Sequence, residues 1–400
     1  MTKKIPLGSA LAVLFIVIAA TIAITMKVSM SVYNNLISDL ASRSSMYDGI
    51  AKIDEIVRKD FYLDVKSENV NAGSVKGYIE GLGDPASFYL SADEYVTYQN
   101  RMQGKMSGTG ISCTYNSETD NLYISAVAKN SPAEAAGIKP GDEITKVGDT
   151  NVTEENSVEL MNNLEGERLA SVYVTVKHDS TSKTVNLVMG YSATSVSYRM
   201  IGSVGIVSIS AFYQNAVSQF DDAMDELQKA GCKAVVFDVR NCSEGSIEYA
   251  TEILDILVPV ATDGTAAMAT IIDKNGETID TYPSDSDCIV LPMLVLVNGA
   301  TKGPAELFAC DLRDFGKAEL IGTKTAGVCT LQEVRRLSNG DAAVLTVTGI
   351  KPYTSESYNG VGLKPNHVVK LTADQTAQIG IMSDADDPHI QKALEIFNID

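Results

Sequence analysis

The chain has 400 residues, of which 45% are hydrophobic and 21% charged, a length that predicts two or three domains. Its 51 acidic residues outnumber 32 Lys and Arg residues, and the formal net charge is -19. Because nucleic-acid binding depends on basic patches that neutralise phosphates, this charge balance excludes DNA and RNA as expected partners.

The first 30 residues differ from the rest in charge and hydropathy. They contain Lys3, Lys4 and Lys27 and no acid, whereas the remainder carries a net charge of -22. From Ile5 to Met26 no side chain is charged, and a helix of that length spans roughly 33 Å, enough for a hydrocarbon core of about 30 Å. We therefore predict that residues 1–30 form a single-pass anchor at the cell membrane, with a cytoplasmic N-terminus and an extracytoplasmic body. A cleaved signal peptide and a buried helix of a soluble protein are the alternatives.

Residues 31–103 are predicted to be mainly helical. Apolar residues such as Ile50, Ile53 and Ile56 recur there at steps of three and four, the spacing of one helix face. A turn is expected at Leu82-Gly83-Asp84-Pro85. Residues 104–190 instead contain short β-branched runs between glycine-containing turns, which predicts a small β-rich module.

Residues 191–400 show strands that alternate with helices. This order is typical of an α/β core with a largely parallel sheet buried on both faces. The predicted strands are Val204–Ile209, Ala234–Val239, Met293–Val297 and a run from Leu320, and the predicted helices are Val217–Leu227, Ile247–Leu257 and Ala305–Phe315.

Cysteine and histidine provide no sign of a disulfide framework or a metal site. The six cysteines are far apart and form no C-x-x-C pair, and none of the three histidines lies near a cysteine cluster. We expect most of the cysteines to be small core residues, and we predict no cofactor.

The β-rich module carries a specific motif. Residues 130–144 read NSPAEAAGIKPGDEI, which resembles the S-P-A-x-x-A-G-[IL]-x-x-G-D-x-I segment of PDZ domains. The resemblance implies that Gly108, Thr109, Gly110 and Ile111 form the loop whose N–H groups hold the terminal carboxylate of a peptide, while a strand edge pairs with the peptide backbone. An ordinary hairpin turn is the alternative for this loop.

Four further segments resemble the carboxyl-terminal processing peptidases, which are serine proteases with an inserted PDZ domain. The segments are GDPASFYL at 83–90, FDVR at 237–240, LVNG at 296–299 with the helix from Glu306 onward, and LSNG at 337–340. They resemble the family motifs L-D-P-H-S-x-Y-L, D-L-R-x-N-P-G-G, V-N-x-x-S-A-S-A-S-E and L-x-D/N-G. The likeness covers roughly residues 50–370 and implies a crotonase-like ββα protease core.

The catalytic positions of that family are substituted. Its nucleophile is the middle serine of S-A-S-A-S-E, and its general base is the lysine of G-K-G. Counting from Glu306 places Gly303 at the nucleophile position and Val328 at the base position, while Gln332 is retained. Glycine offers no nucleophile and valine no titratable group, so the proton transfer that activates a serine is lost.

The loop that resembles N-P-G-G is altered as well. It reads Cys242-Ser243-Glu244-Gly245, so Glu244 replaces a glycine where backbone N–H groups would face an oxyanion, and Gly245 is kept. Asn366, where aspartate is usual, is a smaller departure. A relocated dyad that uses Thr301 with Lys302 or Lys324, or a Cys329 thiol, is the alternative source of chemistry.

These observations predict a catalytically inactive, membrane-anchored, extracytoplasmic protein of the cell envelope. We expect it to bind protein C-termini or unfolded polypeptide segments and to act as a scaffold or regulator, with the helical region supporting a homodimer. An active serine-type endopeptidase with a rearranged site, and a purely structural envelope protein, are the alternatives.

Overall fold

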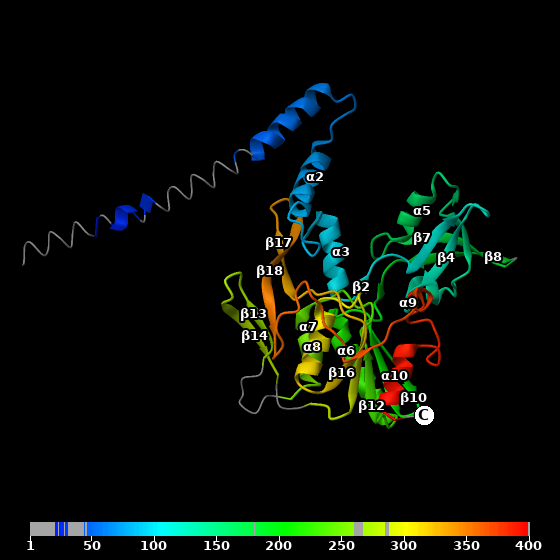
Figure 1. Ribbon diagram of the computed structural model, residues 1–400. Helices are drawn as coiled ribbons and strands as arrows, with labels where there is room; N and C mark the ends of the chain where they lie inside the picture. Colours follow the sequence, from blue (N-terminus) through cyan, green and yellow to red (C-terminus); the bar gives the residue numbers. More distant parts are fainter. Residues whose placement is uncertain are drawn as a thin grey trace, which may run out of the picture. The chain divides into compact units, whose positions relative to one another are not determined.

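The computed structural model describes residues 21–22, 24–27, 29–30, 44, 46–179, 181–259, 267–284 and 288–398. The chain divides into two units, residues 1–75 and 76–400. Figure 1 shows the helices and strands of the described residues.

The described residues of the first unit are mainly helical, as predicted. Residues 46–60 form one helix, which leaves Ile50, Ile53 and Ile56 exposed, and α2 (Ser67–Glu80) begins before the unit ends. The predicted anchor lies largely outside the described residues. Within the residues that are described, no helix combines the length and the apolar character needed to cross a membrane.

The β-rich module is a sheet in the order β3-β4-β5-β7-β8, with β6 paired to β5. Leu122, Ile144 and Val174 point into a core of their own, separate from the core of the peptidase-like part. The short strands β2 and β9 pair with each other where the chain enters and leaves the module. The elements are β2 (Lys105–Met106), β3 (Ile111–Asn116), β4 (Asn121–Val127), α4 (Pro132–Ala135), β5 (Glu143–Val147), β6 (Thr150–Asn151), α5 (Ser157–Leu164), β7 (Ser171–His178), β8 (Thr181–Val188) and β9 (Tyr191–Ser192).

The predicted α/β core contains a six-stranded sheet in the order β10-β11-β12-β15-β16-β19. All neighbouring pairs are parallel except β10 with β11, as the alternation of strands and helices predicted. Its elements are β10 (Val196–Ile201), β11 (Val204–Ile209), α6 (Gln214–Lys229), β12 (Ala234–Asp238), α7 (Ile247–Asp255), β15 (Met293–Val297), α8 (Pro304–Asp314), β16 (Ala318–Gly322), β19 (His367–Val368), α9 (Ala373–Ala377) and α10 (Pro388–Ile396).

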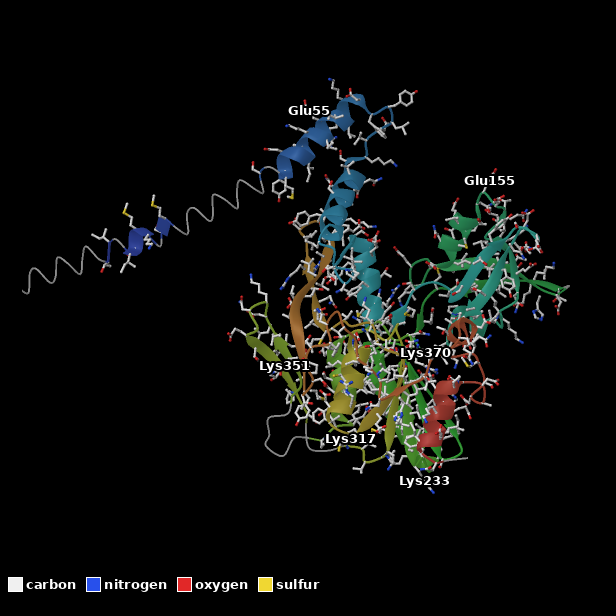
Figure 2. All side chains as sticks on the ribbon, viewed as in Figure 1. Glu55, Glu155, Lys233, Lys317, Lys351 and Lys370 are labelled. Atoms are coloured by element: carbon white, nitrogen blue, oxygen red, sulfur yellow. The ribbon has the colours of Figure 1, made fainter. Side chains whose placement is uncertain are left out.

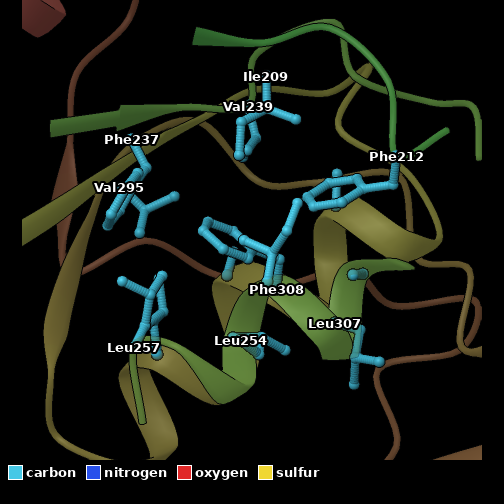
Figure 3. Close-up of a cluster of buried hydrophobic side chains, with 14 of the residues drawn as sticks. Ile209, Phe212, Phe237, Val239, Leu254, Leu257, Val295, Leu307 and Phe308 are labelled. Carbon is cyan, nitrogen blue, oxygen red and sulfur yellow. The ribbon is translucent and has the colours of Figure 1, made fainter. Parts of the chain in front are cut away.

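Both faces of this sheet are buried, because successive side chains of a strand point to opposite faces. Phe237 of β12 joins the larger cluster, which is built with α6, α7 and α8 and includes Phe212 and Phe308 (Figure 3). Val236, its neighbour, joins a second cluster that contains Ile390 of α10. Charged side chains such as Glu155, before α5, and Lys233, before β12, are exposed (Figure 2).

A second sheet was not predicted from the sequence. Its centre is β18 (Ala342–Pro352), which pairs antiparallel with β1, β13 and β17. The strand β1 lies inside the region 31–103, so this region contributes one strand to the second sheet as well as its helices. The remaining elements are β1 (Phe88–Leu90), α3 (Ala92–Met102), β13 (Ala267–Ile272), β14 (Thr278–Pro283) and β17 (Thr330–Arg336).

A buried ionic cluster fastens α10 to the carboxyl end of β12. Arg240 binds Asp238 at 2.7 Å and Asp387, the N-cap of α10, at 2.8 Å. Burial opposes the positive charge, but the two carboxylates outweigh it, and the pKa of Arg240 is raised. Since Arg240 can only donate, His389 Nδ1 accepts from it at 3.1 Å, and Nε2–H donates to the Val369 carbonyl at 3.0 Å.

The cluster predicts a pH dependence of stability. Burial lowers the pKa of His389, and the charge of Arg240 lowers it further. The unfolded chain therefore takes up the proton first, and the stability that neutral His389 supports is lost as pH falls below about 6.5. In the His389→Gln variant the new side chain has a donor and an acceptor but does not titrate. We therefore expect its free energy of unfolding to fall less between about pH 7 and pH 5 than that of the native chain. Urea titrations at each pH check this, and equal falls for both proteins would contradict it.

Candidate functional site

The residues that the sequence placed at the site come together in one cleft. A cavity of about 570 Å³ lies between α3 and the loops of the α/β core. The five predicted positions that line it are Gly303, Val328, Gln332, Glu244 and Gly245. Residues from three separate segments, 244–245, 303 and 328–332, thus lie around one cavity, and their assignment to the family's catalytic positions stays a prediction.

Gly303 adopts a sharp turn at the start of α8. It lies at the N-cap of α8 with φ +59° and ψ -114°, a region that favours glycine. A strained turn before a helix is also how other hydrolases expose a nucleophilic serine. A Cβ built on Gly303 would meet no atom within 4 Å, so the cleft has room for the lost side chain.

One buried carboxylate joins the two catalytic positions. Glu306, in the first turn of α8, is fully buried and accepts from Gly303 N–H at 3.1 Å and from Val328 N–H at 2.7 Å. Gly327 N–H, at 2.7 Å, and the Thr325 hydroxyl bind its other oxygen. Four donors and the positive end of α8 thus compensate the buried charge. The nucleophile turn and the base segment are held at a fixed separation as a result.

Replacing Glu306 tests this contact. In Glu306→Gln one oxygen becomes an amide NH₂ that faces two N–H or O–H donors, so buried donors lose their acceptor. We expect the free energy of unfolding to fall by about 2–3 kcal/mol. The control Glu356→Gln changes an exposed residue and is expected to shift it by less than about 0.5 kcal/mol. Urea denaturation measures both, and equal stabilities for the two variants would contradict the role of Glu306.

The retained glutamine has no lysine to orient. Gln332 Nε2 donates to the hydroxyls of Thr330 and Thr346, each at 3.2 Å. Val328 lines the cleft where a base would stand. Gln332 therefore bonds to two hydroxyls and not to an amine.

Glu244 does not present a free charge to the cleft. Its carboxylate accepts a hydrogen bond from the buried Tyr213 hydroxyl and lies 3.8 Å from the Arg101 guanidinium. Burial and the neighbouring carboxylate both raise the pKa of Tyr213, so its hydroxyl stays protonated as the donor. Glu244 thus stands in the predicted oxyanion loop as a carboxylate with two partners. Gly245 keeps φ +119°, and a Cβ there would lie 2.2 Å from the Phe212 carbonyl oxygen.

The relocated pairs considered from the sequence are not assembled. Thr301 is fully buried, and its hydroxyl donates to the Val239 carbonyl at 2.9 Å and accepts from Asn298 N–H at 3.0 Å. Cys329 is buried, its Sγ contacts the Ile350 carbonyl at 3.1 Å, and burial raises the pKa of its thiol. Of the two lysines considered, Lys302 lines the cleft and Lys324 does not.

Sequence reasoning missed the opposite wall of the cleft. Asp93, Tyr98 and Arg101 of α3 line it, together with Ser243 from the loop before Glu244. No local pattern marks α3 as part of this site, because its contacts with the core are distant in sequence. Ser243 could have been found, since it stands in the motif that carries Glu244.

The predicted carboxylate loop lies before β3 and lines a second cavity of about 250 Å³. Gly108, Thr109, Gly110 and Ile111 all contribute to this cavity. A Cβ on Gly110, which has φ +78°, would lie 2.2 Å from the Ser131 Cβ, so glycine is required there.

Two amides of the loop already have acceptors. Gly108 N–H donates to the Gly166 carbonyl at 3.0 Å and Thr109 N–H donates to the Leu164 carbonyl at 2.9 Å. A peptide carboxylate must displace these carbonyls or use neighbouring amides. The Thr109 hydroxyl is buried and has no hydrogen-bond partner among the described residues. Peptide binding by this loop stays a prediction.

One group of side chains in the described part of the chain has the spacing of a metal site. The ligand atoms of Cys310, Asp311 and Asp314 lie within 4.8 Å of one another on α8. Burial raises the pKa of Asp311 well above its usual range, which favours a neutral carboxyl, and Arg313 Nη2 lies 3.7 Å from Cys310 Sγ. A neutral carboxyl and a neighbouring cation are poor surroundings for a metal ion.

The architecture and the cleft define a peptidase-type α/β core with an inserted peptide-binding module. Family models agree: Peptidase family S41 matches residues 203–369, and the PDZ domain model matches residues 108–189. These matches identify a Peptidase family S41 core and a PDZ domain in this chain, in agreement with the resemblance to the carboxyl-terminal processing peptidases. By that resemblance, Gly303 and Val328 occupy the predicted nucleophile and base positions.

Relatives and solved structures are similar over most of the chain. A "Probable CtpA-like serine protease" of Staphylococcus aureus (strain N315) is 27% identical over 334 residues, which are 82% of this chain and 66% of the relative. The protein of that name in Staphylococcus haemolyticus (strain JCSC1435) is 26% identical, over 82% of this chain and 65% of the relative. The chain thus spans slightly less than two thirds of these relatives' length.

Among solved structures, a putative S41 protease from Bacteroides fragilis NCTC 9343 matches with a TM-score of 0.51 and 20% identity, over 73% of this chain and 83% of that one. This likeness concerns the fold. The photosystem II D1 C-terminal processing protease matches with a TM-score of 0.49 and 24% identity, over 85% of this chain and 92% of that one.

Proposed function

We propose that the protein is a catalytically inactive member of its family that binds protein C-termini or extended segments and acts as a scaffold or regulator. The observation that carries the proposal is a fully formed cleft in which Gly303 and Val328 stand at the nucleophile and base positions. Without a nucleophile, binding and polar contacts leave only about 10³–10⁴-fold acceleration over water. Protein cleavage at a useful rate needs far more.

The proposal includes an anchor in residues 1–30 and an extracytoplasmic body. The uncharged run from Ile5 to Met26 and the lysines that precede it support this placement. Alkaline carbonate extraction of membranes from cells that express the full chain tests it, because release of the chain into the soluble fraction would contradict an anchor.

The exposed Ile50, Ile53 and Ile56 support a second copy of the chain as a partner of the helical region.

An active protease with a rearranged site is the second candidate. The observation that favours it is that Ser243 and Lys302 both line the cleft, and a serine and a lysine are sufficient for acyl transfer when they are in contact.

Proteolysis separates the two candidates. The full chain is incubated with an unfolded casein beside a Ser243→Ala, Lys302→Ala variant, and new amino termini are quantified over time. We expect both proteins to stay at the background of a protease-free sample, because neither has an activated nucleophile. Turnover by the native chain that disappears in the variant would contradict the proposal and establish the rearranged dyad.

A further inference from the structure

Lys302 is a cation without a bonding partner inside the cleft. Its ammonium makes no hydrogen bond and no ion pair with any of the residues that the structure describes, although its side chain is only partly exposed. In the family motif S-A-S-A-S-E the corresponding position is alanine, so this charge is a property of the present chain.

Lys302 stands where two cavities adjoin. It lines the cleft of about 570 Å³ and a neighbouring cavity of about 740 Å³, and the two share Pro85, Ala86, Lys302 and Val328 as walls. The substitution of Val328 for the base lysine removes a second cation from this wall. Lys302 is therefore the charged group closest in sequence to the former nucleophile position, and it precedes the positive end of α8.

Three of the acids near Lys302 have donors of their own. Asp84 accepts from Ala86 N–H at 3.0 Å and from the Ser87 hydroxyl at 2.6 Å, and the charge of Lys302 also stabilises this carboxylate. Glu94 accepts from Ser91 N–H at 2.8 Å as part of the cap of α3. Glu244 is bound to Tyr213 and Arg101, and the fourth acid, Asp93, lies on the first turn of α3. Arg101 is thus paired, whereas Lys302 makes no hydrogen bond or ion pair within the described cleft.

The remainder of the cleft is mostly apolar. Phe88, Leu90, Pro304, Val328 and Val344 line it, and none of these side chains can hydrogen-bond a ligand. A ligand that combines one negative charge with an apolar side chain and an extended backbone matches this surface.

We propose that Lys302 makes the cleft a receptor for the free C-terminal carboxylate of an extended peptide with an apolar last residue. The inference rests on the proposed function, because an active protease would cleave the bound polypeptide instead of holding it. The carboxylate lies against the Lys302 ammonium beside Gly303, and the last side chain packs among Phe88, Pro304 and Val328. Charge-assisted contact at Lys302 then distinguishes a chain end from an internal segment.

A cleft-specific crosslink tests the proposal separately from binding at the PDZ loop. Phe88 is replaced by the photoreactive p-benzoylphenylalanine in the full chain, and crosslinking to a peptide ending in Ala-Leu is titrated with a free or an amidated C-terminus. We expect amidation to raise the half-saturating concentration by about tenfold or more, since it removes the negative charge that the Lys302 ammonium contacts. In Lys302→Met, the two peptides are expected to crosslink equally and weakly. The control Lys324→Met changes an exposed lysine outside the cleft and is expected to behave as the native chain.

The outcomes separate the two hypotheses. Equal half-saturation for free and amidated peptides in the presence of Lys302 would overturn carboxylate capture while leaving peptide binding in place. The absence of a crosslink with either peptide would overturn the proposed binding function of the cleft itself. A preference for the free peptide that persists in Lys302→Met would show that another group holds the carboxylate, and would also overturn the inference.

Discussion

The buried carboxylate of Glu306 is the contact on which the geometry of the cleft depends. It receives hydrogen bonds from Gly303 at the start of α8 and from Gly327 and Val328 in the segment before β17. A buried charge is stable only when its oxygens are fully bonded, so both segments must stay in place for the fold to tolerate Glu306. The requirement is structural and is independent of whether position 303 carries a nucleophile.

This dependence explains how chemistry can be absent from an intact site. Neither Gly303 nor Val328 binds Glu306 through its side chain, since both use backbone N–H groups. Substituting these side chains therefore removes reactivity without removing the contacts that shape the cleft. Glu244 also has partners that hold it in place, because its carboxylate accepts a hydrogen bond from Tyr213 and lies beside the Arg101 guanidinium. The proposed inactive, peptide-binding cleft therefore requires no change in the backbone contacts that shape it.

The sequence predicted the parallel sheet well, because its strands are continuous apolar runs buried on both faces. Val204–Ile209 and Met293–Val297 have the bounds that were predicted. The second sheet was missed because β14 is mostly exposed and β1 finds its partner β18 far along the chain. A short stretch of sequence reveals neither an exposed strand nor a strand whose partner is far along the chain.

The candidate site was also only partly predictable from the sequence. Gly303, Val328 and Gln332, which motif spacing singled out, all line one cleft. The contribution of α3, the pairing of Glu244 with Arg101 and the burial of Thr301 depend on tertiary contacts. Neighbouring residues in the sequence do not reveal such contacts.

The central claim is that the cleft binds polypeptide without cutting it. The most direct measurement is a crystal structure of the full chain grown with a large excess of an extended peptide, with the peptide recovered from dissolved crystals for mass spectrometry. The account predicts an intact peptide across Gly303 and Val328, with the bonds to Glu306 retained. A cleaved peptide, or a covalent bond between peptide and chain in the cleft, would contradict it.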